Sequence, residues 1–140
     1  MRMRVLTHTN KGKLLTIADA VTKQIDADKA TDSIPSAYNC DGERLVVIVA
    51  TAKKSYPESF CRFMRSLKRG VTANVAFIID GTAENAASII EMAKTNNSNV
   101  MEDKILYING GLPFKFAKKV TDEEMEKVKA WTADILANLA

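Results

Sequence analysis

Short continuous apolar runs recur along the chain and predict strands. The clearest are residues 44–51, which include Leu-Val-Val-Ile-Val-Ala, residues 74–79 (Asn-Val-Ala-Phe-Ile-Ile) and residues 104–108 (Lys-Ile-Leu-Tyr-Ile). A shorter run at 5–7 predicts a first strand, and a weaker pattern allows a short strand at 30–34. Because these runs do not alternate with polar residues, they indicate strands buried on both faces, as in a parallel sheet covered by helices.

Between these runs, and after the last one, apolar residues recur at the spacing of a helix. The segments with this spacing are residues 14–21, 60–67, 86–93 and 125–139. Thr121 and Glu124 have the spacing of a capping box, which predicts the start of the last helix. The repeated order of strand, loop and helix predicts the α/β class, with a doubly wound parallel sheet and right-handed crossovers.

Length and composition are those of one domain, which we place over residues 1–140. With 140 residues, 46% of them apolar, the chain can bury roughly two-thirds of its unfolded surface. The longest apolar run, 45–51, is far shorter than the ~20 residues that span a bilayer, so no membrane contact is expected. Residues 1–5 lack the apolar stretch of a signal peptide, and we therefore expect a cytoplasmic protein.

The residue types present argue against several site chemistries. Cys40 and Cys61 are 21 positions apart and form no CxxC pair, which argues against a disulfide framework or a zinc ribbon. His8 is the single histidine, so a site of several imidazoles is excluded and a structural role is expected for His8. The 20 basic and 17 acidic residues give a net charge of +3, too small an excess to predict nucleic-acid binding. We predict no metal site and no catalytic side chain.

The carboxyl ends of the predicted strands are the places to look for a ligand. Open parallel sheets bind ligands beyond these ends, where the order of the strands reverses. The candidate loops are residues 9–13, 51–57, 80–83 and 109–114.

The first of these loops reads Thr-Asn-Lys-Gly-Lys. Gly12 allows a tight turn, the first N–H groups of the following helix lack partners, and Lys11 and Lys13 add positive charge. The loop can therefore accept a phosphate-type anion. Its composition alone favours the alternative, a polar turn with solvated lysines. Neither the P-loop pattern nor the dinucleotide fingerprint is present.

The order of elements, the length and the loop positions resemble a short-chain flavodoxin over nearly the whole sequence. That family carries the motif S/T-x-T-G-N-T after its first strand, where it wraps the phosphate of FMN. The aligned residues here are Thr9, Asn10, Lys11, Gly12, Lys13 and Leu14. Thr9 and Gly12 fit the motif, whereas Lys11, Lys13 and Leu14 depart from it, and Leu14 removes a hydroxyl that would touch the phosphate.

The resemblance implies a three-layer sandwich, with a five-stranded parallel sheet of order 2-1-3-4-5 and helices on both faces. It implies FMN as the cofactor, bound also by two further loops. The second loop supplies Thr51, Ala52, Lys53 and Tyr56, and the third supplies Asp80, Gly81 and Thr82. Tyr56 would stack on the isoalloxazine ring at a gain of roughly 1 kcal/mol, or alternatively pack against the next helix.

Two functions from different classes remain open. In the first, the protein binds FMN non-covalently and transfers electrons to a redox partner protein of unknown identity. In the second, the flavodoxin-like fold persists as a binding or regulatory module that has lost FMN, as the departures at Lys11, Lys13 and Leu14 indicate. We prefer FMN, and we expect a monomer or a weak homodimer.

Overall fold

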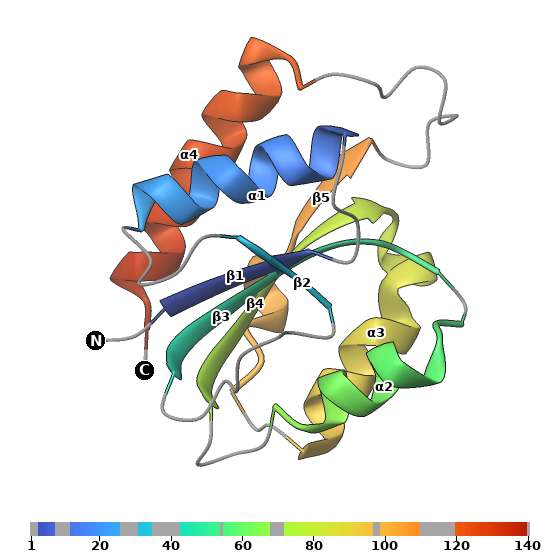
Figure 1. Ribbon diagram of the computed structural model, residues 1–140. Coiled ribbons are helices and arrows are strands. Elements are labelled where there is room, and N and C mark those ends of the chain that lie inside the picture. The colour runs from blue at the N-terminus through green and yellow to red at the C-terminus, as the bar shows by residue number, and fades with distance from the viewer. Residues whose placement is uncertain are drawn as a thin grey trace.

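A parallel sheet forms the middle layer of the fold (Figure 1). The computed structural model describes residues 3–7, 12–25, 31–34, 43–53, 55–67, 72–96, 99–109 and 120–139. The strands are β1 (Met3–Thr7), β2 (Asp32–Ser33), β3 (Glu43–Thr51), β4 (Thr72–Gly81) and β5 (Leu106–Asn109). They lie in the order β2-β1-β3-β4-β5, and each neighbouring pair is parallel. The predicted α/β class with a parallel sheet is confirmed.

Helices cover both faces of this sheet (Figure 1). One layer holds α1 (Gly12–Gln24) and α4 (Asp122–Ala137), and the other holds α2 (Glu58–Arg65) and α3 (Ala83–Asn96). Successive strand residues point to opposite faces, so Val47 packs beneath α1 and α4 whereas Ile48 packs beneath α2 and α3. Both layers bury their side of the strand, which is why the apolar run in β3 is continuous.

The capping box predicted for the last helix is confirmed. Thr121 Oγ1 accepts a hydrogen bond from the Glu124 backbone N–H at 3.1 Å, and Glu124 Oε1 accepts one from the Thr121 N–H at 3.1 Å. The predicted apolar stripe follows, with Val128, Trp131 and Ile135 buried against the sheet. The sequence therefore fixes both where α4 begins and which side of it faces inward.

The predicted strand at 104–108 is partly wrong, because β5 begins only at Leu106. The chain first forms an isolated bridge between Val100 and Val75, and then a short 3-10 turn, η1 (Glu102–Lys104). The Lys104 N–H donates to the Met101 carbonyl at 3.1 Å, and the indole N–H of Trp131 donates to the Lys104 carbonyl. Lys104 is therefore part of a turn beneath α4 rather than part of the sheet.

The helices within the described ranges are short, from 8 residues in α2 to 16 in α4. None of them is long and apolar enough to cross a bilayer.

Candidate functional site

The carboxyl ends of the strands meet along one edge of the sheet. Thr7 of β1 pairs with Val49 of β3, two residues before that strand ends at Thr51. Thr51 in turn pairs with Asp80, one residue before β4 ends at Gly81. The loops that follow these strands therefore start side by side. The predicted site residues Thr9, Asn10 and Lys11 lie outside the described residues.

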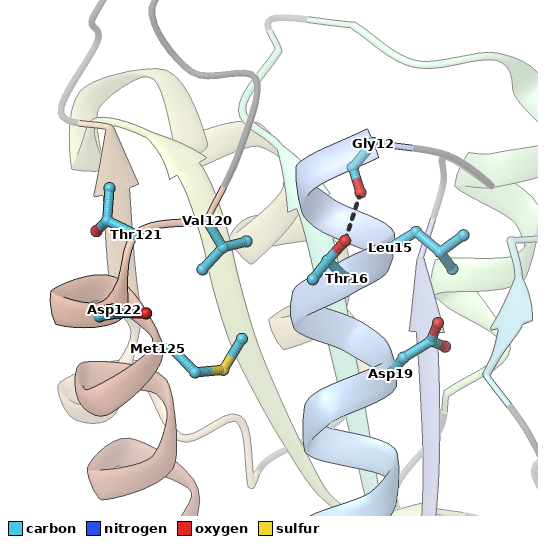
Figure 2. A pocket seen from close by; sticks show the side chains of 8 residues that line it. All are labelled: Gly12, Leu15, Thr16, Asp19, Val120, Thr121, Asp122 and Met125. Carbon is cyan, nitrogen blue, oxygen red and sulfur yellow. Dashed lines mark hydrogen bonds between the residues drawn. The ribbon is translucent and has the colours of Figure 1, made fainter.

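Gly12 begins α1 at this edge with a left-handed backbone conformation, at φ +80°. An ideal Cβ built at Gly12 would meet no atom within 4 Å, so the glycine opens onto free space. Thr16 Oγ1 donates to the Gly12 carbonyl at 3.2 Å, as Figure 2 shows. The first N–H groups of α1 start at this open position, which suits an anion.

The next two predicted phosphate ligands turn inward. Lys13 Nζ lies 2.6 Å from Glu124 Oε2 of α4, and the side chain of Lys13 is 7% exposed. Leu14 joins the apolar core between α1, α4 and the sheet. The positive charge of Lys13 is thus already matched by a carboxylate. Its role as a phosphate ligand stays a prediction that the structure does not test.

Glu124 links the first turns of two helices. One carboxylate oxygen accepts from Lys13, and the other accepts from the backbone N–H of Thr121. Burial by itself raises the pKa of Glu124, but the hydrogen bonds from Lys13 and Thr121 outweigh it and hold this pKa below the ordinary value of 4.5. The carboxylate therefore stays ionised at neutral pH and fixes the start of α4 against α1.

Tyr56 lies in the loop after β3, where contacts to its hydroxyl and to its ring hold the side chain in place. Its hydroxyl donates to the Thr51 carbonyl at 2.7 Å and accepts from the Lys53 N–H at 3.0 Å. Its ring stacks on Phe60 of α2, with centroids 4.3 Å apart and an interplanar angle of 10°. Burial raises the pKa of Tyr56, so the phenol remains protonated. The alternative that the sequence left open for Tyr56, packing against the next helix, is therefore what the structure shows.

The loops after β3 and β4 are packed tightly together. The Ala52 N–H donates to the Asp80 carbonyl at 3.0 Å. Gly81 has φ +144°, and an added Cβ would lie 2.8 Å from the Cβ of Ala52. Thr82 caps α3, because its hydroxyl accepts from the Asn85 N–H at 3.3 Å. Five of the predicted residues here, Thr51, Ala52, Asp80, Gly81 and Thr82, are half-buried, and Lys53 is exposed. They form an accessible row at the edge of the sheet.

A groove of 490 Å³ runs along the N-terminal ends of α1 and α4 (Figure 2). It is lined by Gly12, Leu15, Thr16, Asp19, Val120, Thr121, Asp122 and Met125. Figure 2 shows Val120 and Met125 pointing toward α1 from the start of α4. This contribution of α4 was not predicted from the sequence. The capping box marked where the helix begins, but nothing in the local pattern placed that end beside Gly12.

Metal chemistry has no support within the described ranges, where no three His, Cys, Asp or Glu side chains are grouped to hold an ion. Cys61 is a free thiol in α2 that donates to the Tyr56 carbonyl at 3.6 Å. It serves to fasten the loop of Tyr56 to α2. His8 and Cys40 lie outside the described residues.

Comparisons with known proteins bear on the fold. No protein-family model matches the chain, and no curated protein matches it. Among solved structures, oxidised flavodoxin 2 from Bacillus cereus is similar, with a TM-score of 0.64 and 14% sequence identity. The similarity covers 98% of this chain and 99% of that one. The chain has a flavodoxin-like fold.

Proposed function

We propose that this protein binds FMN non-covalently at the carboxyl edge of the sheet and carries electrons. The observation that carries the proposal is the alignment of the ends of β1, β3 and β4, with Gly12 open to free space beside them. The full-length similarity in fold to a flavodoxin supports the same site. Ligands of open parallel sheets bind at such an edge.

The residues at this edge fit different parts of FMN. The N–H groups that follow Gly12 suit the phosphate, and by sequence Thr9, Asn10 and Lys11 belong to the same loop. The half-buried residues Ala52, Asp80 and Gly81 lie where the edge of the ring would sit, and Tyr56 lies in the loop beside them. When bound, FMN supplies the redox chemistry, because its ring accepts and donates electrons.

Two side chains set the environment of the ring. The bonds from Tyr56 to Thr51 and Lys53 fix the phenol in the loop beside the ring, with no further loss of rotamer freedom. Lys53 is exposed in the same loop. A cation beside the ring stabilises the negative charge gained on reduction, so Lys53 raises the reduction potential of the bound flavin.

The purified protein is expected to bind FMN at least about tenfold more tightly than riboflavin, since a phosphate at a helix N-terminus makes charge-assisted hydrogen bonds. The measurement is a titration of flavin-free protein with each compound, in which the quenching of flavin fluorescence reports binding. Equal affinity for the two compounds would remove the phosphate site from the proposal.

The Lys11→Glu variant is expected to weaken FMN binding roughly tenfold while changing riboflavin binding little, because the reversed charge repels the phosphate. Lys129→Glu is the matched control. Lys129 is exposed on α4, with 58% of its side chain accessible, and its sequence position is not in any candidate loop. A comparable loss in both variants would indicate an effect of net charge and contradict the loop assignment.

A second candidate is a flavodoxin-fold module that binds no flavin. It is favoured by two contacts that occupy groups suited to FMN, the Lys13–Glu124 ion pair and the stack of Tyr56 on Phe60. The same titration decides between the candidates. Absence of saturable binding of both FMN and riboflavin to folded protein would select this second function.

A further inference from the structure

The groove along the N-terminal ends of α1 and α4 has a lining that, apart from Gly12, the proposed FMN site does not use. Three of its side chains, Leu15, Val120 and Met125, are apolar and half-buried. Its volume of 490 Å³ lies within the range of small-molecule sites, about 300–1,000 Å³. Size and lining therefore suit a small ligand with an apolar body.

The charged side chains that line this groove are both acidic. Asp19 comes from α1 and Asp122 from the first turn of α4. Both are exposed, and neither forms an ion pair or a side-chain hydrogen bond in the part of the chain that the structure describes. No lysine or arginine stands among the described lining residues. The groove thus presents two negative charges without a counter-charge of its own.

The hydroxyl groups of the groove are already used within the protein. Thr16 Oγ1 donates to the Gly12 carbonyl at 3.2 Å, and Thr121 Oγ1 accepts from the Glu124 N–H at 3.1 Å. The side-chain polar groups that remain for a ligand are therefore the carboxylates of Asp19 and Asp122.

These carboxylates are separate from the position that suits a phosphate. That position is formed by the N–H groups that follow Gly12. Asp19 lies seven residues later in α1, which corresponds to roughly 10 Å at 1.5 Å per residue. Figure 2 shows Asp19 farther down α1 than Gly12, and Asp122 across from it on α4. A cation in the groove and an anion at Gly12 would therefore occupy different places.

We propose that this groove binds a small organic cation, an aliphatic amine. Its ammonium group meets the carboxylates of Asp19 and Asp122, and its alkyl chain lies on Leu15, Val120 and Met125. Opposite charge selects the ammonium, and the removal of apolar surface from water favours the chain. The proposal does not depend on FMN binding.

The same lining disfavours two other kinds of ligand. A metal ion needs several oxygen ligands close together, and within the described ranges no three His, Cys, Asp or Glu side chains are grouped to hold one. A small anion would be repelled by the two carboxylates, which no basic lining residue offsets.

The test is a titration of the ¹⁵N-labelled, flavin-free protein with hexylamine at neutral pH, where the amine is protonated. Saturable shifts in the NMR signals of the backbone amides of Leu15, Thr16 and Met125 are expected. Hexanol keeps the chain without the charge, and methylamine keeps the charge without the chain. Each is expected to bind at least about fivefold more weakly than hexylamine. Hexanoate is expected to cause no saturable shift at these amides.

A pair of matched variants tests the carboxylates. Asp19→Asn/Asp122→Asn is expected to weaken hexylamine binding about fivefold or more. Asp103→Asn/Glu84→Gln removes the same charge from exposed positions outside the groove and is expected to change binding less than about twofold. The NMR spectrum of each variant also reports whether it is folded.

Three results would overturn the proposal. Hexanol binding as tightly as hexylamine would show that the carboxylates play no part. Equal weakening by the two variant pairs would assign the effect to net charge. Absence of saturable shifts at the lining amides would remove the site. Because the titration uses flavin-free protein, none of these results bears on FMN binding, and a failure to bind FMN would leave the amine site intact.

Discussion

Gly81→Ala is expected to destabilise the protein by about 2–4 kcal/mol, the sum of backbone strain and a steric clash. Gly81 ends β4 with φ +144°, a conformation that L side chains rarely adopt, and the new Cβ would lie 2.8 Å from the Cβ of Ala52. To relieve the clash, the loops after β3 and β4 would have to move apart. The hydrogen bond from the Ala52 N–H to the Asp80 carbonyl opposes this movement. Urea unfolding followed by the fluorescence of Trp131, the single tryptophan, measures the loss.

Two control variants separate strain from clash. Gly12→Ala places a Cβ at φ +80° in open space, so it carries strain alone and is expected to cost about 1–2 kcal/mol. Ala52→Gly/Gly81→Ala removes the opposing methyl group and is expected to recover the part of the loss due to the clash. A loss no larger at Gly81 than at Gly12 would show that the loops after β3 and β4 are not tightly packed.

Lys13→Met is expected to cost about 1–3 kcal/mol at neutral pH, because it leaves the half-buried carboxylate of Glu124 without its cation. Methionine keeps most of the volume of the lysine stem, so the packing between α1 and α4 is little changed. Lys127→Met is the matched control, since Lys127 pairs with Glu123 at 3.7 Å on the exposed side of α4. Its expected cost is at most about 0.5 kcal/mol.

The effect of Lys13→Met is expected to depend on pH. The pKa of Glu124 is lowered in the folded protein, so its contribution to stability is complete above the ordinary value of 4.5 and is lost as the pH falls through the folded value. The difference in free energy of unfolding between wild type and Lys13→Met should therefore shrink in acid. If this difference in free energy of unfolding stayed constant from pH 7 to below the folded pKa of Glu124, the ion pair would not stabilise the fold.

The ion pair also bears on the proposed cofactor site. Lys13 directly follows Gly12, so the pair sets the spacing of α1 and α4 next to the open N-terminal end of α1. If FMN binds there as proposed, Lys13→Met should weaken FMN and riboflavin by similar factors, since the ammonium is directed at Glu124 and not at the phosphate. A selective loss of FMN would assign Lys13 to the phosphate after all.

Much of the fold could be predicted from local pattern. The uninterrupted apolar runs in β3 and β4 required cover on both faces, and the structure provides it through two helical layers. The capping box of Thr121 and Glu124 located the start of α4 because both of its hydrogen bonds are local. The beginning of β5 was misplaced, because Lys104 is drawn into a turn by a contact from Trp131, 27 residues later in the chain.

The candidate site was also predictable from the sequence only in part. Local pattern predicted which loops follow parallel strands, and it identified Gly12 and Gly81 as positions in such loops, because apolar runs and glycines can be read from short stretches of the chain. The directions of the side chains in these loops depend on how the elements pack in three dimensions. It pairs Lys13 with a carboxylate 111 residues away, stacks Tyr56 on Phe60, and brings the start of α4 beside α1. Such contacts depend on how separate elements pack, and no periodicity in the chain reports the distance between two helices that cover the same sheet.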